Sequence, residues 1–185
     1  MNTYQLEAVM NRDRFSQSKF IGVFPMDLLP KNKIEHCTRP FCLIINSAPS
    51  TNEGEHWLAV YVDVYGEGQL FDSYGNNANF YDRRLETFLK KNCTEHSYNK
   101  SELQALWSDV CGQHCLYFLL HRSRHIPAKT ILELFGRNKL VNDSLVDAFI
   151  HKHFPSVFQI HANTFTRMLQ SKQQKSQTRY TCTHQ

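Results

Sequence analysis

A cysteine that opens an apolar stretch is the strongest candidate for a chemically active side chain. Cys111 precedes Gly112 and the apolar run CLYFLL (115–120), so we expect it at a helix N-terminus, with Ser108 or Asp109 as the cap. There the positive end of the helix dipole lowers a thiol pKa from about 8.5 towards roughly 3.5–7.5 when a cation is near. Gly112 would leave room beside the sulfur for a substrate backbone. The alternative is a small buried apolar side chain, the common fate of free cysteine.

A histidine and an aspartate are placed to act with that thiol. His56 precedes a strand-like segment, 57–64, and Asp72 ends the next one, 69–73. The turn YGEG between them predicts a hairpin, in which the start of one strand lies beside the end of the other, so these side chains should meet. An imidazole could take the thiol proton, and a carboxylate would orient the ring. The alternatives are a surface or packing histidine and a turn carboxylate that binds its own backbone.

An amide side chain lies ahead of the candidate nucleophile. Gln104 precedes Cys111 by seven residues. An amide at that place could donate a hydrogen bond to the oxyanion of a tetrahedral intermediate. The alternative is that Gln104 is an ordinary surface glutamine.

The chain lacks the usual signatures of metal and nucleotide sites. Its cysteines form no paired CxxC motif, so we expect no zinc site and no other metal. It contains neither GxxxxGK[ST] nor GxGxxG. Besides Cys93 and Cys111 the chain has four cysteines. We expect Cys42 and Cys115 to be core thiols, Cys37 a loop thiol and Cys182 a tail thiol.

Length and composition indicate one domain with a tail. The chain has 185 residues, of which 41% are hydrophobic, so it can form a core without disulfides. We expect the domain at 1–168 and a disordered basic tail at 169–185. There is no membrane-length apolar run and no secretory signal, which predicts an intracellular protein with thiols rather than disulfides. A net charge of +4 permits weak DNA binding without requiring it.

The spacing of apolar residues predicts the elements that would position these side chains. Helical spacing with start and stop signals is found near 6–10, over 81–92, between Pro127 and Gly136, over 115–122, and from a cap at Asn142 and Asp143 to Ile150. Strand-like runs occupy 19–24, 41–46, 57–64 and 69–73. The run at 115–122 is apolar on every side. These patterns predict an α+β fold, with a small mixed sheet packed around one buried central helix.

Several motifs in this chain order resemble the adenovirus-type (adenain-like) cysteine proteases, which share a clan with the SUMO-specific proteases. GEHWLAVYVDV matches the segment of the catalytic histidine, at His56, and LFDSYG that of the acidic residue, at Asp72. LQALWSDVCGQHC matches the oxyanion glutamine, at Gln104, and the nucleophile, at Cys111. The resemblance covers about residues 2–155 and implies the α+β core of these proteases, with that catalytic triad.

Other phrases look like the proteases encoded by Polinton (Maverick) transposons. They are FIGVFPMDLLP, FDSYGNN, VCGQHCLYFLLHR and NDSLVDAFI. This likeness implies polypeptide substrates, namely capsid or other structural precursors of a virus-like element, cut near small residues such as glycine. It also implies a nuclear or particle-associated location.

The resemblance carries a possible role for cofactors as well. In the adenoviral enzyme a cysteine upstream of the nucleophile pairs with an activating peptide, and DNA is a second cofactor. Cys93 stands in the matching region, 18 residues before Cys111, and is the candidate for that disulfide. The chemistry of the triad itself requires no cofactor.

Two other functions compete with the processing of structural precursors. The first is a deconjugating protease for ubiquitin-like modifiers, which would use the same chemistry on a folded substrate. The second is a catalytically silent protein, derived from a transposon, that binds nucleic acid or a protein. Oligomeric state is not indicated by the sequence.

Overall fold

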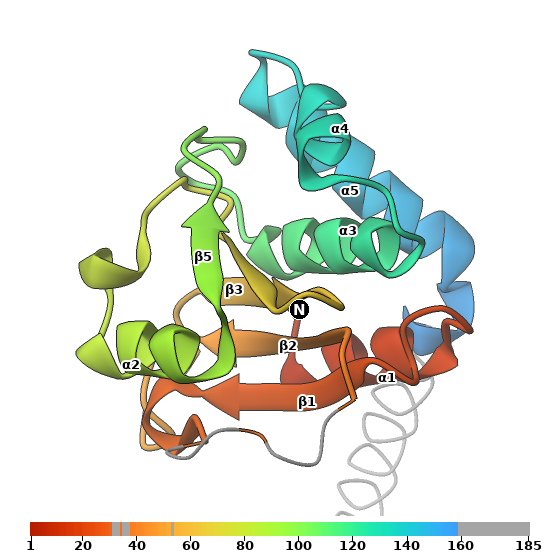
Figure 1. The fold of residues 1–185 in the computed structure, drawn as a ribbon. Helices are drawn as coiled ribbons and strands as arrows, with labels where there is room; N and C mark the ends of the chain where they lie inside the picture. Colours follow the sequence, from red (N-terminus) through yellow and green to blue (C-terminus); the bar gives the residue numbers. More distant parts are fainter. Residues whose placement is uncertain (31–33, 35–37, 53, 159–185) are drawn as a thin grey trace, which may run out of the picture.

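A five-stranded mixed sheet forms the centre of the molecule (Figure 1). The computed structural model describes residues 1–30, 34, 38–52 and 54–158. The strands lie side by side in chain order, β1 to β5, at Phe20–Pro25, Phe41–Asn46, Trp57–Val62, Glu67–Phe71 and Glu95–Tyr98. The two outer pairs, β1–β2 and β4–β5, are parallel, whereas β2–β3 and β3–β4 are antiparallel. The fold is therefore α+β, as the sequence predicts.

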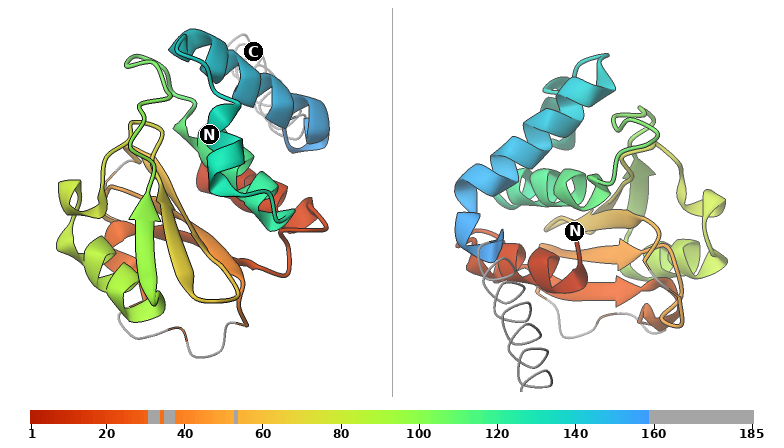
Figure 2. Two further views of the ribbon diagram at one scale, coloured as in Figure 1. Left: turned by 45° about the horizontal axis from the view of Figure 1, so that its top comes forward. Right: turned by 180° about the vertical axis from the view of Figure 1, so that it is seen from behind.

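Helices cover both faces of this sheet (Figure 2). One face carries α1, α3, α4 and α5, at Thr3–Arg12, Cys111–Ser123, Ala128–Glu133 and Lys139–His153. The other face carries α2 and the short 3-10 helix η1, at Arg83–Asn92 and Met26–Leu28; a second 3-10 helix, η2, spans Ala78–Phe80. Side chains of β2 and β3 alternate between the two cores, so these strands need apolar residues at nearly every position.

Helix α3 is the buried central helix that the sequence predicts. Every one of its residues except His121 is buried. It lies against β3 on one side and α5 on the other, and Phe118 stacks on Phe71 of β4 with ring centroids 4.6 Å apart. A helix enclosed in this way holds its first residue, Cys111, in a fixed place relative to β3 and β4.

The expected elements are present, with three corrections. Strand β5 is not predicted, because its sequence EHSY is short, polar and exposed. Asn142 and Asp143 do not cap α5: the cap is Asn138, whose side chain accepts from the N–H groups of Leu140 and Val141. Similarly, neither Ser108 nor Asp109 caps α3, since its N-cap is Val110, without a side-chain bond.

Some predictions concern residues outside the described part of the chain. These are the basic tail at 169–185, the domain boundary at 168, and the thiols Cys37 and Cys182. Cys42 and Cys115 are fully buried, as predicted. In the part of the chain that the structure describes, no helix has the length and apolarity needed to span a membrane.

Candidate active site

The β3–β4 hairpin brings His56 and Asp72 into contact. Ala59 of β3 pairs with Phe71 of β4, so the residue after β4 lies level with the start of β3. The Nε2 atom of His56 and the Oδ1 atom of Asp72 are 2.7 Å apart. The hairpin prediction therefore places this pair correctly, while their catalytic roles stay predictions.

The Asp72 carboxylate is fully buried and accepts hydrogen bonds from four groups. Its Oδ1 accepts from His56 and from the N–H of Tyr74, at 2.9 Å. Its Oδ2 accepts from the N–H of Asn76, at 2.9 Å, and from the hydroxyl of Tyr81, at 2.8 Å. Burial raises the pKa of Asp72, but these bonds, that from His56 foremost, outweigh burial and hold the pKa below its usual value. The group is therefore a carboxylate at neutral pH.

The sequence does not single out four residues that support Asp72, namely Tyr74, Asn76, Tyr81 and Asn99. Asn99 binds the Asp72 backbone twice: its Oδ1 accepts from the N–H at 2.9 Å, and its Nδ2 donates to the carbonyl at 2.6 Å. Tyr74 stacks on the His56 ring, with centroids 4.8 Å apart. The phrase FDSYGNN is a signal for the turn that holds Tyr74, but Tyr81 reads as part of the next helix, and Asn99 follows the unpredicted strand.

The thiol of Cys111 and the ring of His56 shift each other's pKa. The Nε2 atom of the ring is occupied by Asp72. Burial raises the pKa of Cys111, but the hydrogen bond and positive charge of His56 outweigh it, so the pKa is lowered. Burial lowers the pKa of His56, but bonds to Asp72 and Cys111 outweigh that effect and raise the pKa to about 9. Both shifts favour a thiolate–imidazolium pair.

Trp57 follows His56 and is buried. The residue is 8% exposed, and its Nε1 donates to the carbonyl of Met1 at 3.2 Å. Its backbone N–H group favours the thiolate of Cys111 and helps to lower the pKa of that thiol. Trp57 thus acts on Cys111 through its main chain.

Gly112 serves close packing rather than substrate access. A Cβ atom at this position would lie 3.1 Å from the Cβ of Met1 and 3.3 Å from side-chain atoms of Leu6 and Trp57. The missing side chain therefore lets α3 approach the start of the chain and β3.

Asp109 is exposed and points away from the core. It does not cap α3.

Gln104 is fully buried in the loop before α3. Its Oε1 accepts from the Ser73 hydroxyl at 2.6 Å, and its Nε2 donates to the Ser108 carbonyl at 2.7 Å. A longer contact, 3.1 Å, joins Nε2 to the Ser108 hydroxyl. The N–H groups of Leu103 and Gln104 both donate to the Ser73 carbonyl. Gln104 is thus an ordered amide and not a surface residue.

Cys93 lies away from these residues. It follows α2 and faces Gly68, at the end of β4 opposite to Asp72. Burial raises the pKa of Cys93 to about 11, which favours the thiol form. A disulfide with an activating peptide stays a prediction. Among the described residues, no group of three or more His, Cys, Asp or Glu side chains could hold a metal ion.

Comparisons with known proteins identify proteases with a similar sequence or a similar fold. No model of a known protein family matches the chain. A protease of Bovine adenovirus 4 is 27% identical in an alignment of 115 residues that covers 54% of this chain and 54% of that protein. The alignment thus spans about half the length of this curated relative.

Solved structures match over more of the chain. The ASFV pS273R protease has a TM-score of 0.53 and 16% identity, over 77% of this chain and 63% of that one. The fold is that of the adenain and SUMO-protease type. The central domain of the uncharacterized Lpg1148 protein from Legionella pneumophila matches with a TM-score of 0.49 and 12% identity, over 86% of this chain and 98% of that one.

Proposed function

We propose that the protein is a cysteine endopeptidase with Cys111 as nucleophile, His56 as base and Asp72 as the residue that orients the base. The observation that carries the proposal is the placement of Cys111 at the start of an enclosed helix, where it shares charge with His56, whose Nε2 lies 2.7 Å from the buried carboxylate of Asp72. Such an arrangement is what activation of a thiol requires. The protease of Bovine adenovirus 4, similar over about half of the chain, supports peptide hydrolysis.

In the proposed reaction the thiolate of Cys111 attacks the carbonyl carbon of a peptide bond. The tetrahedral intermediate collapses when His56 donates its proton to the leaving amine, which leaves an acyl-enzyme. Water, deprotonated by His56, then attacks the thioester, and its breakdown frees the acid and regenerates the thiolate–imidazolium pair. Asp72 stabilises the imidazolium through both halves of the cycle.

Gln104 and the backbone N–H of Cys111 are the proposed donors to the oxyanion. Val110 provides no side-chain cap for α3, so no capping side chain competes with an oxyanion for the N–H groups of the first turn. The Gln104 amide has two N–H bonds, and its longer contact, to the Ser108 hydroxyl, is one that an oxyanion could replace.

The pH dependence of alkylation tests the proposed ion pair. Because the pKa of Cys111 is lowered and that of His56 is about 9, thiolate and imidazolium coexist between these two values. At pH 6 an ordinary thiol of pKa about 8.5 is less than about 1% ionised. We therefore expect iodoacetamide at pH 6 to add one group rapidly to the wild type and not to Cys111→Ser, as measured by intact mass.

The same shifts predict the pH profile of hydrolysis. Activity should rise as Cys111 loses its proton and fall as the pH passes the His56 pKa of about 9, because the leaving amine then lacks its proton donor.

In the alkylation test, slow labelling by iodoacetamide at pH 6 that is spread over several cysteines, and is unchanged by added DNA or peptide, would contradict the proposal.

Replacing Gln104 by alanine tests the oxyanion site. Loss of one such donor costs about 10²–10³ in kcat. Since Gln104 does not touch the thiol, the alkylation rate of Cys111 at pH 6 should stay that of the wild type. A Gln104→Ala enzyme with the wild-type kcat would remove this residue from the mechanism.

The substrates that we propose are capsid or other structural precursors of a virus-like element, cut near glycine. The support is the resemblance to adenovirus-type and Polinton (Maverick) proteases. On the same basis we propose a nuclear or particle-associated location, and activation by DNA and by a peptide that forms a disulfide with Cys93. A peptide library gives the cleavage motif. Efficient labelling of Cys111 by a ubiquitin-like-protein probe would favour a deconjugating protease instead, and an unreactive Cys111 would favour a silent binding protein.

A further inference from the structure

Helix α5 buries two polar side chains in its first turns. Asn142 is 2% and Asp143 7% exposed, although both lie beside the apolar core residues Val146 and Ile150. An amide and a carboxylate are costly to bury unless their hydrogen-bonding groups are satisfied. Their partners therefore show what these side chains do.

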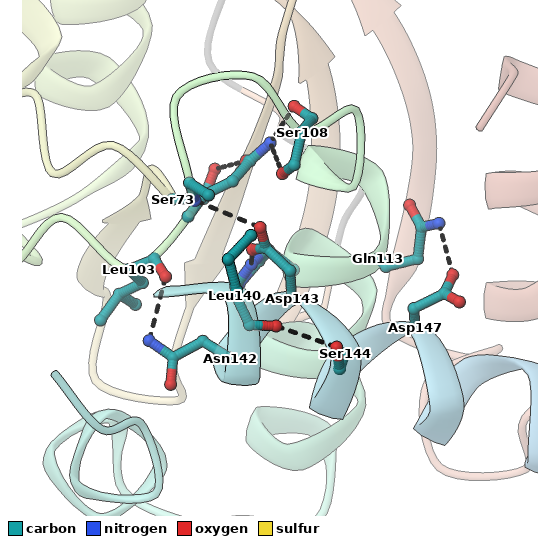
Figure 3. A network of polar contacts seen from close by, with 12 residues as sticks. Ser73, Leu103, Ser108, Gln113, Leu140, Asn142, Asp143, Ser144 and Asp147 are labelled. Atoms are coloured by element: carbon teal, nitrogen blue, oxygen red, sulfur yellow. Dashed lines mark hydrogen bonds and ion pairs between the residues drawn. The ribbon is translucent and has the colours of Figure 1, made fainter. Parts of the chain in front are cut away.

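Asn142 and Asp143 bind the backbone on both sides of Gln104 (Figure 3). The Nδ2 atom of Asn142 donates to the carbonyl of Leu103 at 3.0 Å. The Oδ2 atom of Asp143 accepts from the N–H of Ala105 at 3.2 Å. The same Asn142 amide also bridges the N–H and the carbonyl of Gly136 before the helix. The residue that we propose as oxyanion donor is thus held by its two chain neighbours.

Asp143 also connects this loop to the nucleophile helix. Its Oδ1 accepts from Nε2 of His114, at 2.9 Å. His114 is fully buried and lies one helical turn after Cys111. Burial lowers the pKa of His114, against the raising effect of Asp143, so the ring is neutral with its proton on Nε2. One carboxylate thereby joins α3 to the segment 103–105.

We infer that Asn142, Asp143 and His114 are positioning residues that set the Gln104 amide relative to Cys111. The inference rests on the proposed function, because it concerns the oxyanion donor of that reaction. Ser73 and Ser108 fix the Gln104 side chain, whereas these three residues fix the loop that carries it to the rigid helix of the nucleophile. A displacement of about 1 Å at a reacting group can cost about 10²-fold in rate.

Replacing Asp143 by alanine tests this inference. We expect kcat for a peptide substrate to fall about 10²-fold, with KM changed little. The rate of Cys111 alkylation at pH 6 should stay that of the wild type, because neither His56 nor Asp72 is touched. A general loss of structure would instead slow alkylation together with hydrolysis.

A double-mutant cycle shows whether Asp143 acts through Gln104. In a protein that already carries Gln104→Ala, we expect Asp143→Ala to lower kcat by less than about threefold. If the two losses multiply instead, Asp143 does not act through Gln104 and the inference is wrong.

The matched control is Asp147→Ala, one turn further along α5. Asp147 accepts from Gln113 Nε2 at 3.0 Å, so it also joins α5 to α3, but it has no contact with the loop among those that the structure describes (Figure 3). We expect its kcat within about twofold of the wild type. An equal loss in both variants would overturn the inference, because it would indicate helix packing alone.

A second variant and the activity of the wild type distinguish a failure of this inference from a failure of the proposed function. Asp143→Asn keeps the side-chain volume but offers one oxygen for the two bonds, so it provides a folded variant if Asp143→Ala does not fold. Its kcat should also fall by tenfold or more, and a wild-type kcat would overturn the inference. A wild type without any hydrolysis would refute the proposed function, whereas an active wild type with an equally active Asp143→Ala would refute this inference alone.

Discussion

Replacement of Cys111 by alanine is expected to abolish peptide hydrolysis. No other described thiol can take its place: Cys115 is the nearest along α3, but it is fully buried and donates to the carbonyl of Trp57 at 3.2 Å. Burial raises the pKa of Cys115 far above its usual value, so it is not a nucleophile. Loss of a triad nucleophile costs on the order of 10⁶-fold in kcat. Initial rates on a peptide from the library measure this loss.

Cys115→Ala provides the matched control for the nucleophile. It removes a thiol from the same helix, one turn away, and should leave kcat within a few-fold while lowering the melting temperature slightly. Hydrolysis that persists in Cys111→Ala and disappears in Cys115→Ala would show that Cys115, and not Cys111, is the nucleophile. Hydrolysis that persists in both would refute the cysteine mechanism.

Replacement of His56 by alanine is expected to reduce kcat by a similar factor, on the order of 10⁶. This change removes both the proton donor of the leaving amine and the positive charge that lowers the pKa of Cys111. Burial then acts on the thiol without that opposition, so its pKa rises. Unlike Gln104→Ala, this variant should therefore lose rapid alkylation at pH 6 as well as hydrolysis.

His96→Ala is a suitable control for this variant. His96 lies on β5, where its Nε2 is 3.4 Å from a carboxylate oxygen of Glu86, and it does not contact the proposed triad. Both hydrolysis and alkylation should match the wild type. If His56→Ala kept fast labelling of Cys111 at pH 6, the thiol would owe its reactivity to some other group and the proposed ion pair would be incorrect.

The parts of the site that follow from local sequence patterns are predictable. His56 and Asp72 are 16 residues apart and meet because a tight turn joins two apolar strands, a relation that depends only on the register of one hairpin. The place of Cys111 at the start of a buried helix follows from the apolar run behind it. Each inference needs only one element or one turn.

The supporting contacts depend on distant segments, and the sequence does not show them. Asn99 follows a four-residue polar strand that pairs only at its inner edge, so no periodicity marks it. Asn142 and Asp143 precede an apolar run and have the residue types of a helix cap, but the helix starts earlier, at the cap Asn138. Their side chains enter the core and bind a loop about 40 residues earlier.

The position of α5 near the end of the described chain affects when the site becomes complete. A ribosome adds residues from the N-terminus, so the hairpin of His56 and Asp72 leaves it first, then α3 with Cys111, and α5 last of these. A nascent chain that ends at Ser123 holds the nucleophile, its base and its carboxylate but lacks Asn142 and Asp143. Such a chain contains the thiol and its base, whereas the contacts of Asn142 and Asp143 with the loop of Gln104 cannot yet form. If the proposed mechanism is correct, full activity therefore requires that α5 has been synthesised.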